Sequence, residues 1–395
     1  MGEAIKLGRR LLTLSIIVSM TLATAHPAQA ATRYEVGIAT SATLLRMKDA
    51  ELADRLNNIK QLGANWLRVD FSWRAIQPNG PDQYEWEEYD RLVRVANEHR
   101  FKILAVINYT PAWAREPECV AKVKYEEVAK KCAPRSNEEF GRFVRALAIR
   151  YKGTNIRGWE IWNEPNLIGH WKSAKTNNKL TVDPKAYAEL ANIAAAQIRH
   201  NYLDSVIITG GLAPMFEPKP FMGMRQSDYL AALLPRLKPE LFDGIAIHPY
   251  SWPLNPGVTE SYNAFYTVDN GKPHFNLRAV MAKAGWGEKE IWGTEFGAST
   301  KGLRRSGLFR PQDRPDHVSE PVQARIIEEG LDLWYKKENV GPLFVHSDSD
   351  KWLLKSKNEG GFGLRRTDGT KKPAHDALQQ ASERVTSKAD PQLQW

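Results

Sequence analysis

The feature that most constrains the fold is a regular alternation of short strand-like segments with longer helical ones. Runs rich in β-branched and aromatic residues, typical of strands, recur between segments whose apolar residues are spaced three and four apart. The sequence predicts eight strands, at 34–40, 65–73, 102–109, 156–164, 205–211, 244–250, 290–296 and 342–347. Helical patterns lie between them, notably over 49–63, 87–100, 137–153, 187–202 and 321–338, with Gly63 and Gly153 where two helices should end.

This order of elements predicts an α/β fold, a (β/α)8 TIM barrel that forms a single domain over residues 31–386, with a C-terminal tail at 387–395. The units carry no repeated sequence motif and no interdomain linker separates them. An open α/β sheet is the alternative, but no glycine-rich phosphate-binding fingerprint follows the first strand. In a barrel of this type the active site forms at the carboxyl ends of the strands.

The first thirty residues have the pattern of an export signal. Lys6, Arg9 and Arg10 precede an apolar run over 11–25, and small residues at Ala28 and Ala30 suit cleavage. A membrane anchor is the alternative, but the run is short for a bilayer span of about 20 apolar residues. We therefore predict a signal peptide over 1–30, no stable membrane span after its removal, and a secreted, periplasmic or cell-envelope location.

The predicted export bears on the redox state of the two cysteines. Cys119 and Cys132 are the complete set, and an even count in an oxidising compartment favours a disulfide. Closing a loop of that size would stabilise the chain by about 3 kcal/mol. No histidine or second cysteine pair lies nearby in the sequence, so we expect no metal site there.

The charge balance bears on partners. The formal net charge is +9, spread along the chain, which fits either a solvated basic surface or affinity for an acidic polymer. Nothing resembles a nucleic-acid-binding module, so we expect no nucleic-acid partner. We also expect a monomer without a cofactor.

Polar residues gather where the predicted strands end, and two of them are glutamates on the fourth and seventh strands. A barrel places these strands across its mouth from each other, so Glu164 and Glu295 should face one another. Two carboxylates across a cleft are what glycosidic bond cleavage requires. The other strand-end residues are Arg68, Asp70, Asn108, Asn163, His248, Tyr250, His346 and Asp348.

The flanks of the two glutamates resemble a known family. WEIWNEPN at 159–166 and WGTEFG at 292–297 resemble the strand-four and strand-seven motifs of the retaining glycoside hydrolases in the large (β/α)8 clan. That clan includes cellulase-like (family 5-like), β-xylosidase (family 39-like) and α-L-iduronidase enzymes. IAIHPY, LRVDFSW and NYTPAWA are similar to its strand-six, strand-two and strand-three patterns, so the resemblance covers roughly residues 34–380.

The resemblance implies roles for the two carboxylates and their neighbours. Glu164 would be the acid/base and Glu295 the nucleophile, with a carboxyl separation of about 5 to 5.5 Å. Like charge and partial burial should raise the pKa of Glu164, so that the group stays protonated. Asn163 would bind the sugar 2-hydroxyl, and Arg68 would keep Glu295 ionised.

His248 and Tyr250 would hydrogen-bond around Glu295, and Asn108 is a further candidate for substrate binding. Flat aromatic faces after the strand ends could carry sugar rings, and the candidates are Trp113, Trp171, Trp252 and Trp352. We favour Trp113, which lies within the strand-three motif. The eighth strand departs from the family's aromatic-rich end and reads FVHSDSDKW, where Trp352 is the expected floor of the sugar site.

Together these features predict a retaining glycoside hydrolase acting on an extracellular or envelope polysaccharide or oligosaccharide. The β-linkage follows from the resemblance alone. Endo action is expected from export and from the aromatic residues at strand ends. The alternatives are an exo-acting, β-xylosidase-like enzyme and a catalytically silent carbohydrate-binding barrel.

Overall fold

The computed structural model describes residues 34–40, 42–174, 179–216, 222–301, 317–351 and 358–387. The predicted signal peptide, Trp352 and most of the C-terminal tail lie outside the described residues. Within these ranges, no helix has the length and apolar character needed to cross a membrane.

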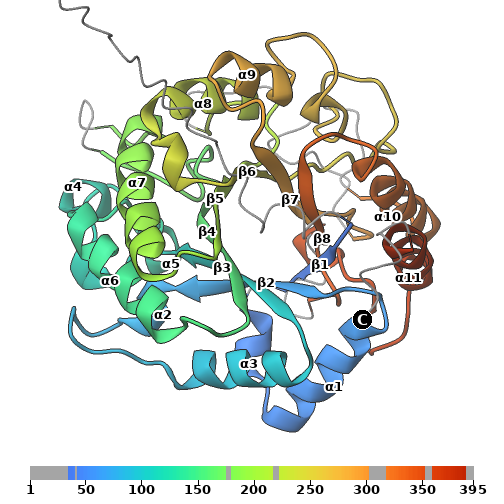
Figure 1. Ribbon diagram of the computed structural model, residues 1–395, viewed down its shortest axis with the longest axis horizontal. Helices are drawn as coiled ribbons and strands as arrows, with labels where there is room; N and C mark the ends of the chain where they lie inside the picture. Colours follow the sequence, from blue (N-terminus) through green and yellow to red (C-terminus); the bar gives the residue numbers. More distant parts are fainter. Residues whose placement is uncertain are drawn as a thin grey trace, which may run out of the picture.

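The strands form one closed, parallel barrel in which each strand pairs with the next along the chain and β8 pairs with β1. Figure 1 shows them ringing the centre of the molecule with the helices around them. The predicted (β/α)8 barrel is confirmed, and every strand overlaps its predicted segment. The strands are β1 (Val36–Ala39), β2 (Trp66–Ser72), β3 (Lys102–Asn108), β4 (Ile156–Asn163), β5 (Val206–Gly211), β6 (Gly244–Ile247), β7 (Glu290–Phe296) and β8 (Val340–Val345).

The helices cover the outside of the barrel and present their apolar faces to the strands. They are α1 (Asp49–Lys60), α2 (Trp73–Ile76), α3 (Glu87–Glu98), α4 (Pro117–Val120), α5 (Glu126–Ala129), α6 (Asn137–Arg150), α7 (Pro184–Asn201), α8 (Gln226–Leu233), α9 (Leu277–Lys283), α10 (Glu320–Trp334) and α11 (Pro373–Thr386). Gly63 and Gly153 follow the ends of α1 and α6 with φ of +77° and +78°, the left-handed conformation that glycine adopts without strain. Ser136 and Asp183 cap α6 and α7 by accepting backbone N–H groups.

The inside of the barrel holds an aromatic layer, and charged side chains lie between this layer and the carboxyl ends of the strands. Trp66 and Trp292 meet edge to face at 5.4 Å between ring centroids, and Phe344 packs beside them. Two residues further along β2 the inward position is Arg68, which is only 2% exposed. The aromatic layer fills the barrel and leaves the polar side chains at the carboxyl ends of the strands.

The long segments after β3 and β4 are fastened to each other. Cys119 and Cys132 form the predicted disulfide, with Cα atoms 5.9 Å apart. Backbone bonds join Lys172 to Lys131 and Ala133, and buried Glu116 accepts hydrogen bonds from the next segment. These contacts hold the wall beside the ends of β3 and β4.

Candidate active site

The end of β4 departs from regular alternation and so delivers two adjacent polar side chains to the barrel mouth. Trp162 has φ of +74° and packs outward against Trp171, with 4.9 Å between ring centroids. Asn163 and Glu164 follow, and Glu164 has φ of +49°. Non-glycine residues in this conformation cost about 1 to 3 kcal/mol each and tend to occur at functional sites. The strain falls on the motif that the sequence singles out.

A similar irregularity serves β7. The pairing of β7 with β8 shifts register between Gly293 and Phe296. Thr294 therefore reaches Glu160 inside the barrel, while Glu295, the next residue, reaches Arg68. Strict alternation would have sent one of these two side chains to the helix layer.

The two glutamates meet across the mouth. One oxygen of Glu164, Nδ1 of His248 and one oxygen of Glu295 all lie within 4.8 Å of one another. Retaining glycosidases hold their carboxyl groups about 5 to 5.5 Å apart, whereas inverting enzymes leave room for a water molecule. The spacing therefore suits direct attack by one carboxylate.

Glu295 is held as a carboxylate. Arg68 donates from Nη1 at 2.6 Å and Tyr250 donates from its hydroxyl at 2.8 Å. Burial opposes ionisation, but the charges of His248 and Arg68 prevail and lower the pKa of Glu295 to about 2. An ionised oxygen is thus available at any pH near neutrality.

Glu164 differs from what the sequence predicts. His248 Nδ1 lies 2.9 Å from one carboxylate oxygen and His170 Nε2 lies 2.9 Å from the other. Burial would raise the pKa of Glu164, but the two imidazoles hold that pKa well below its usual range. The expected rise was wrong because it considered Glu295 and burial without these histidines.

The expected partner of His248 also needs correction. Its Nδ1 binds Glu164 at 2.9 Å and lies 3.8 Å from Glu295, so Tyr250 alone of this pair hydrogen-bonds to Glu295. Burial lowers the pKa of His248, but the two glutamates outweigh it and the net shift is upward. The imidazole therefore lies closer to Glu164 than to Glu295.

A buried ion pair supports the site from below. Arg68 donates to Glu160 from Nε at 2.7 Å and from Nη2 at 2.9 Å, and Nη2 also reaches Asn163 Oδ1 at 2.7 Å. Glu160 is fully buried and also accepts the backbone N–H of Gly211. The sequence analysis missed Glu160, although a glutamate inside the strand that leads to Glu164 was a usable signal.

Two strand-end residues complete the polar wall. Asn108 donates from Nδ2 to Asp70 at 3.0 Å, and burial raises the pKa of Asp70. Within the described part of the chain, the buried Oδ1 of Asn108 has no hydrogen-bond partner. Such an atom can receive a ligand hydroxyl.

The aromatic candidates fare differently. Trp113 is half-buried, packs edge-on against Trp73 and donates to the Gln77 carbonyl, so its described contacts lie away from the two glutamates. Trp171 is fully buried and has no face for a sugar. Trp252 packs edge-on against Phe362 at 5.8 Å between ring centroids.

His346 follows the eighth strand, whereas Trp352, the expected aromatic platform, lies outside the described residues. His346 packs against Phe362 at 5.3 Å between ring centroids, and the charge of Glu295 acts on it. Burial lowers the pKa of His346 to about 4, which leaves a neutral imidazole. Its buried Nδ1 has no partner among the residues that the structure describes.

Among the described residues, one group of three possible metal ligands has its donor atoms close together. It consists of Glu164, His248 and Glu295. Their donor atoms already hold protein partners, the imidazole on Glu164 and the guanidinium and phenol on Glu295. The arrangement matches proton transfer and nucleophilic attack by the residues themselves.

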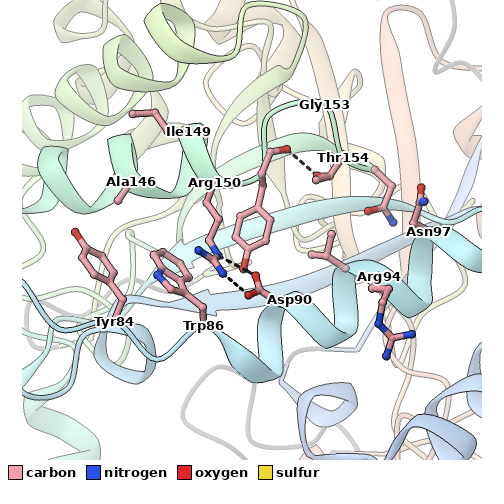
Figure 2. Close-up of a pocket in the computed structure, with 13 residues that line it drawn as sticks. Tyr84, Trp86, Asp90, Arg94, Asn97, Ala146, Ile149, Arg150, Gly153 and Thr154 are labelled. Carbon is pink, nitrogen blue, oxygen red and sulfur yellow. Dashed lines mark hydrogen bonds and ion pairs between the residues drawn. The ribbon is translucent and has the colours of Figure 1, made fainter.

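A groove of about 790 Å³ lies elsewhere, on the outside of the barrel between α3 and α6 (Figure 2). Asp90 is the single acidic residue in its lining, and it is bound by Arg150 and Tyr151. Tyr84 stacks on Trp86, whose ring also receives Arg150. The groove offers no carboxylate pair, so the barrel mouth is the candidate active site.

Comparison with known proteins agrees with this geometry. The model of one family, described as Cellulase (glycosyl hydrolase family 5), matches residues 30–313. No curated protein matches the sequence significantly.

Solved structures share the fold at low sequence identity. A family 39 glycoside hydrolase from Bacteroides cellulosilyticus WH2 aligns with a TM-score of 0.62 at 20% identity, over 90% of this chain and 64% of that one. A monomeric β-xylosidase from Caulobacter crescentus CB15 gives 0.61 at 19%, over 88% and 68%. A family 5 (GH5_18) protein from Streptomyces cattleya, solved in complex with GlcNAc, gives 0.62 at 16%, over 91% and 82%. This chain thus spans somewhat under two thirds of the first of these proteins.

Proposed function

The chain belongs to the cellulase family, glycosyl hydrolase family 5, and we propose that it hydrolyses β-glycosidic bonds of a polysaccharide or oligosaccharide with retention of configuration. The observation that carries this proposal is the pair Glu164 and Glu295, close enough across the barrel mouth for double displacement. The environments of the two groups differ, as their two roles require.

In the first step Glu295 attacks the anomeric carbon, and the bond to the leaving oxygen breaks. Arg68 and Tyr250 aim the attacking carboxylate, and the leaving oxygen takes a proton from Glu164 in its protonated form. Because the imidazoles favour the ionised form of Glu164, only the protonated fraction supports this step. We therefore expect the first step to be fastest at acidic pH.

In the second step water attacks the glycosyl ester on Glu295, and Glu164 removes a proton from that water. The ionised state of Glu164 is the one that this base requires. The ester bond to Glu295 breaks and the sugar leaves with its original configuration. The same side chain thus gives and then recovers one proton.

The polar wall supports a carbohydrate ligand. Among the described residues, the buried Asn108 Oδ1 and His346 Nδ1 have no hydrogen-bond partner, and sugar hydroxyls can both donate and accept. A neutral His346 favours polar contact with the sugar bound at Glu295. The basic net charge of +9 favours an acidic polymer.

We further propose endo action on a polymer outside the cytoplasm. The export signal predicted from the sequence supports the location, and the long segments after β3 and β4, joined to each other, can wall an extended cleft. Product analysis decides the mode of cleavage. Early internal cleavage of a polymer indicates endo action, and release of single units from one end indicates the exo alternative.

The test is covalent trapping. The protein is incubated with a panel of activated 2-deoxy-2-fluoro β-glycosides, including short oligosaccharides, and analysed by intact mass and peptide mapping. A single adduct on Glu295 is expected, and an adduct on any other residue overturns the role assignment. In parallel, Glu164→Ala should lose hydrolysis, and added azide should restore turnover of an activated aryl glycoside as a β-glycosyl azide.

The silent-barrel alternative has its own outcome. If no sugar labels the protein and no glycan is hydrolysed, while Glu164→Gln and wild type bind the same glycan on an array, the protein is a binder and not an enzyme.

A further inference from the structure

We propose that His170 is a positioning residue for the acid/base, oriented by Asn163 so that its Nδ1 accepts a hydrogen bond and its Nε2–H group donates to the carboxylate of Glu164. This inference rests on the proposed function and deepens the account of the same site. His170 lies in the segment after β4 and was not among the residues that the sequence predicted.

The position of the ring is set by its own segment. The backbone N–H of His170 donates to the Leu167 carbonyl at 2.9 Å, and its carbonyl accepts the indole N–H of Trp162 at 2.9 Å. The side chain is 28% exposed, against 0% for His248. His170 therefore approaches Glu164 from the open side of the cleft, and His248 from the buried side.

The tautomer follows from a chain of hydrogen bonds. Arg68 has only donors, so the atom of Asn163 that it contacts at 2.7 Å must be the carbonyl oxygen. The other end of the amide is then an NH₂ group, which lies 3.3 Å from Nδ1 of His170.

A donor facing Nδ1 requires that nitrogen to be the acceptor, so in a neutral ring the hydrogen sits on Nε2. Nε2 lies 2.9 Å from Oε2 of Glu164 and donates to it. The guanidinium that binds the nucleophile thus also determines, through Asn163, which hydrogen the acid/base receives.

The consequence is an acid/base that favours its carboxylate form. A hydrogen bond donated to a carboxylate stabilises the charged state. His248 also acts on Glu164, and the charge of Glu164 is felt by four further titratable groups, namely Glu295, Tyr109, Tyr250 and Lys131. They remain in place when only residue 170 changes.

Two substitutions at residue 170 distinguish the effect of its hydrogen bonds from the effect of its side-chain volume. His170→Gln keeps a donor toward Glu164 and an acceptor toward Asn163, without any charge. His170→Phe keeps a flat ring and removes both bonds. The backbone contacts of residue 170 persist in both variants, and thermal melting checks that each one folds.

The measurement is the pH dependence of kcat/KM, with the 4-nitrophenyl β-glycoside of whichever sugar labels Glu295. In His170→Phe the alkaline limb should move to higher pH by about one unit, because the free carboxylate has lost a donor. In His170→Gln the limb should stay near that of wild type. An unshifted limb in His170→Phe overturns the proposal, as does a limb in His170→Gln that shifts as far as in His170→Phe, since His170 would then act by its charge.

A second readout needs no turnover. Nitrogen-15 spectra of histidine-labelled protein should show His170 with its hydrogen on Nε2 and none on Nδ1, and Asn163→Ala should disturb that arrangement. An imidazolium or an Nδ1–H tautomer at this position in wild type overturns the inference. If no glycoside is hydrolysed, the proposed function fails while this spectrum still tests the tautomer.

Discussion

Removal of Arg68 should destabilise the protein more than any other single change at the site. The guanidinium is 2% exposed and contacts the carboxylates of Glu160 and Glu295 as well as the amide of Asn163. In Arg68→Met the buried Glu160 loses its countercharge, and removing one partner of a buried ion pair costs about 3 to 5 kcal/mol. We expect the free energy of unfolding to fall by that amount.

The assay is urea unfolding followed by tryptophan fluorescence, with the double variant Arg68→Met/Glu160→Met as the matched control. Replacing both ions with apolar side chains of similar size is often neutral, so the double variant should recover most of the lost stability. Comparison with Glu160→Met alone closes a double-mutant cycle and isolates the pairwise energy.

Two results would refute this reasoning. The first is unfolding of Arg68→Met at the same urea concentration as wild type, which would mean that the pair does not hold the barrel mouth together. The second is a stability loss in the double variant equal to the sum of the two single losses, which would exclude coupling. Hydrolysis should stay low even in a double variant that regains stability, because Glu295 would still lack the cation that lowers its pKa.

Three further outcomes can be measured. Replacing Cys119 and Cys132 with alanine should lower the free energy of unfolding by about 3 kcal/mol, and equal melting of oxidised and reduced protein would contradict this. In Gly211→Ala the new methyl group would lie 2.4 Å from the imidazole of His248, which binds Glu164, so kcat/KM should fall at least tenfold. Gly287→Ala, where the new methyl group has contacts of 3.5 Å or more, should change neither activity nor stability. The pKa of Glu295 falls from 4.5 to about 2, so its contribution to stability is present above pH 4.5 and declines as the pH falls toward 2; melting temperatures of Glu295→Gln should depend less on pH in that window.

The architecture could be predicted because the strands and the helices of the barrel each have a characteristic pattern of apolar residues in the sequence. Strands covered on both faces read as continuous apolar runs, and helices read as three- and four-residue spacing. The disulfide was accessible to the same reasoning, because cysteine count and predicted export are properties of the sequence. Boundaries shifted by a few residues, as for β6, which ends at Ile247 where the sequence suggested continuation to residue 250.

The sequence predicted which residues form the site better than it predicted the hydrogen bonds between them. Strand ends converge in a barrel, so the sequence alone predicts that Glu164 and Glu295 lie close to each other. The contacts between the carboxylate oxygens and the imidazoles depend on the register shift of β7 and on the path of the segment after β4. Neither of these features produces a periodic pattern in the sequence. The pKa of Glu164 was predicted in the wrong direction for that reason, because His170 reaches it through a turn.

The charged layer beneath the site is better explained by function than by stability. An apolar pair at positions 68 and 160 would fill the barrel without any desolvation cost, and the aromatic layer just below shows that this chain can fill a barrel in that way. The single guanidinium, however, reaches Glu295 directly and Glu164 through Asn163 and His170. A stability loss at Arg68 without a matching change in the pH dependence of hydrolysis would leave the ion pair as scaffolding. Coupled changes in both would show that one buried cation sets the protonation states of both catalytic groups.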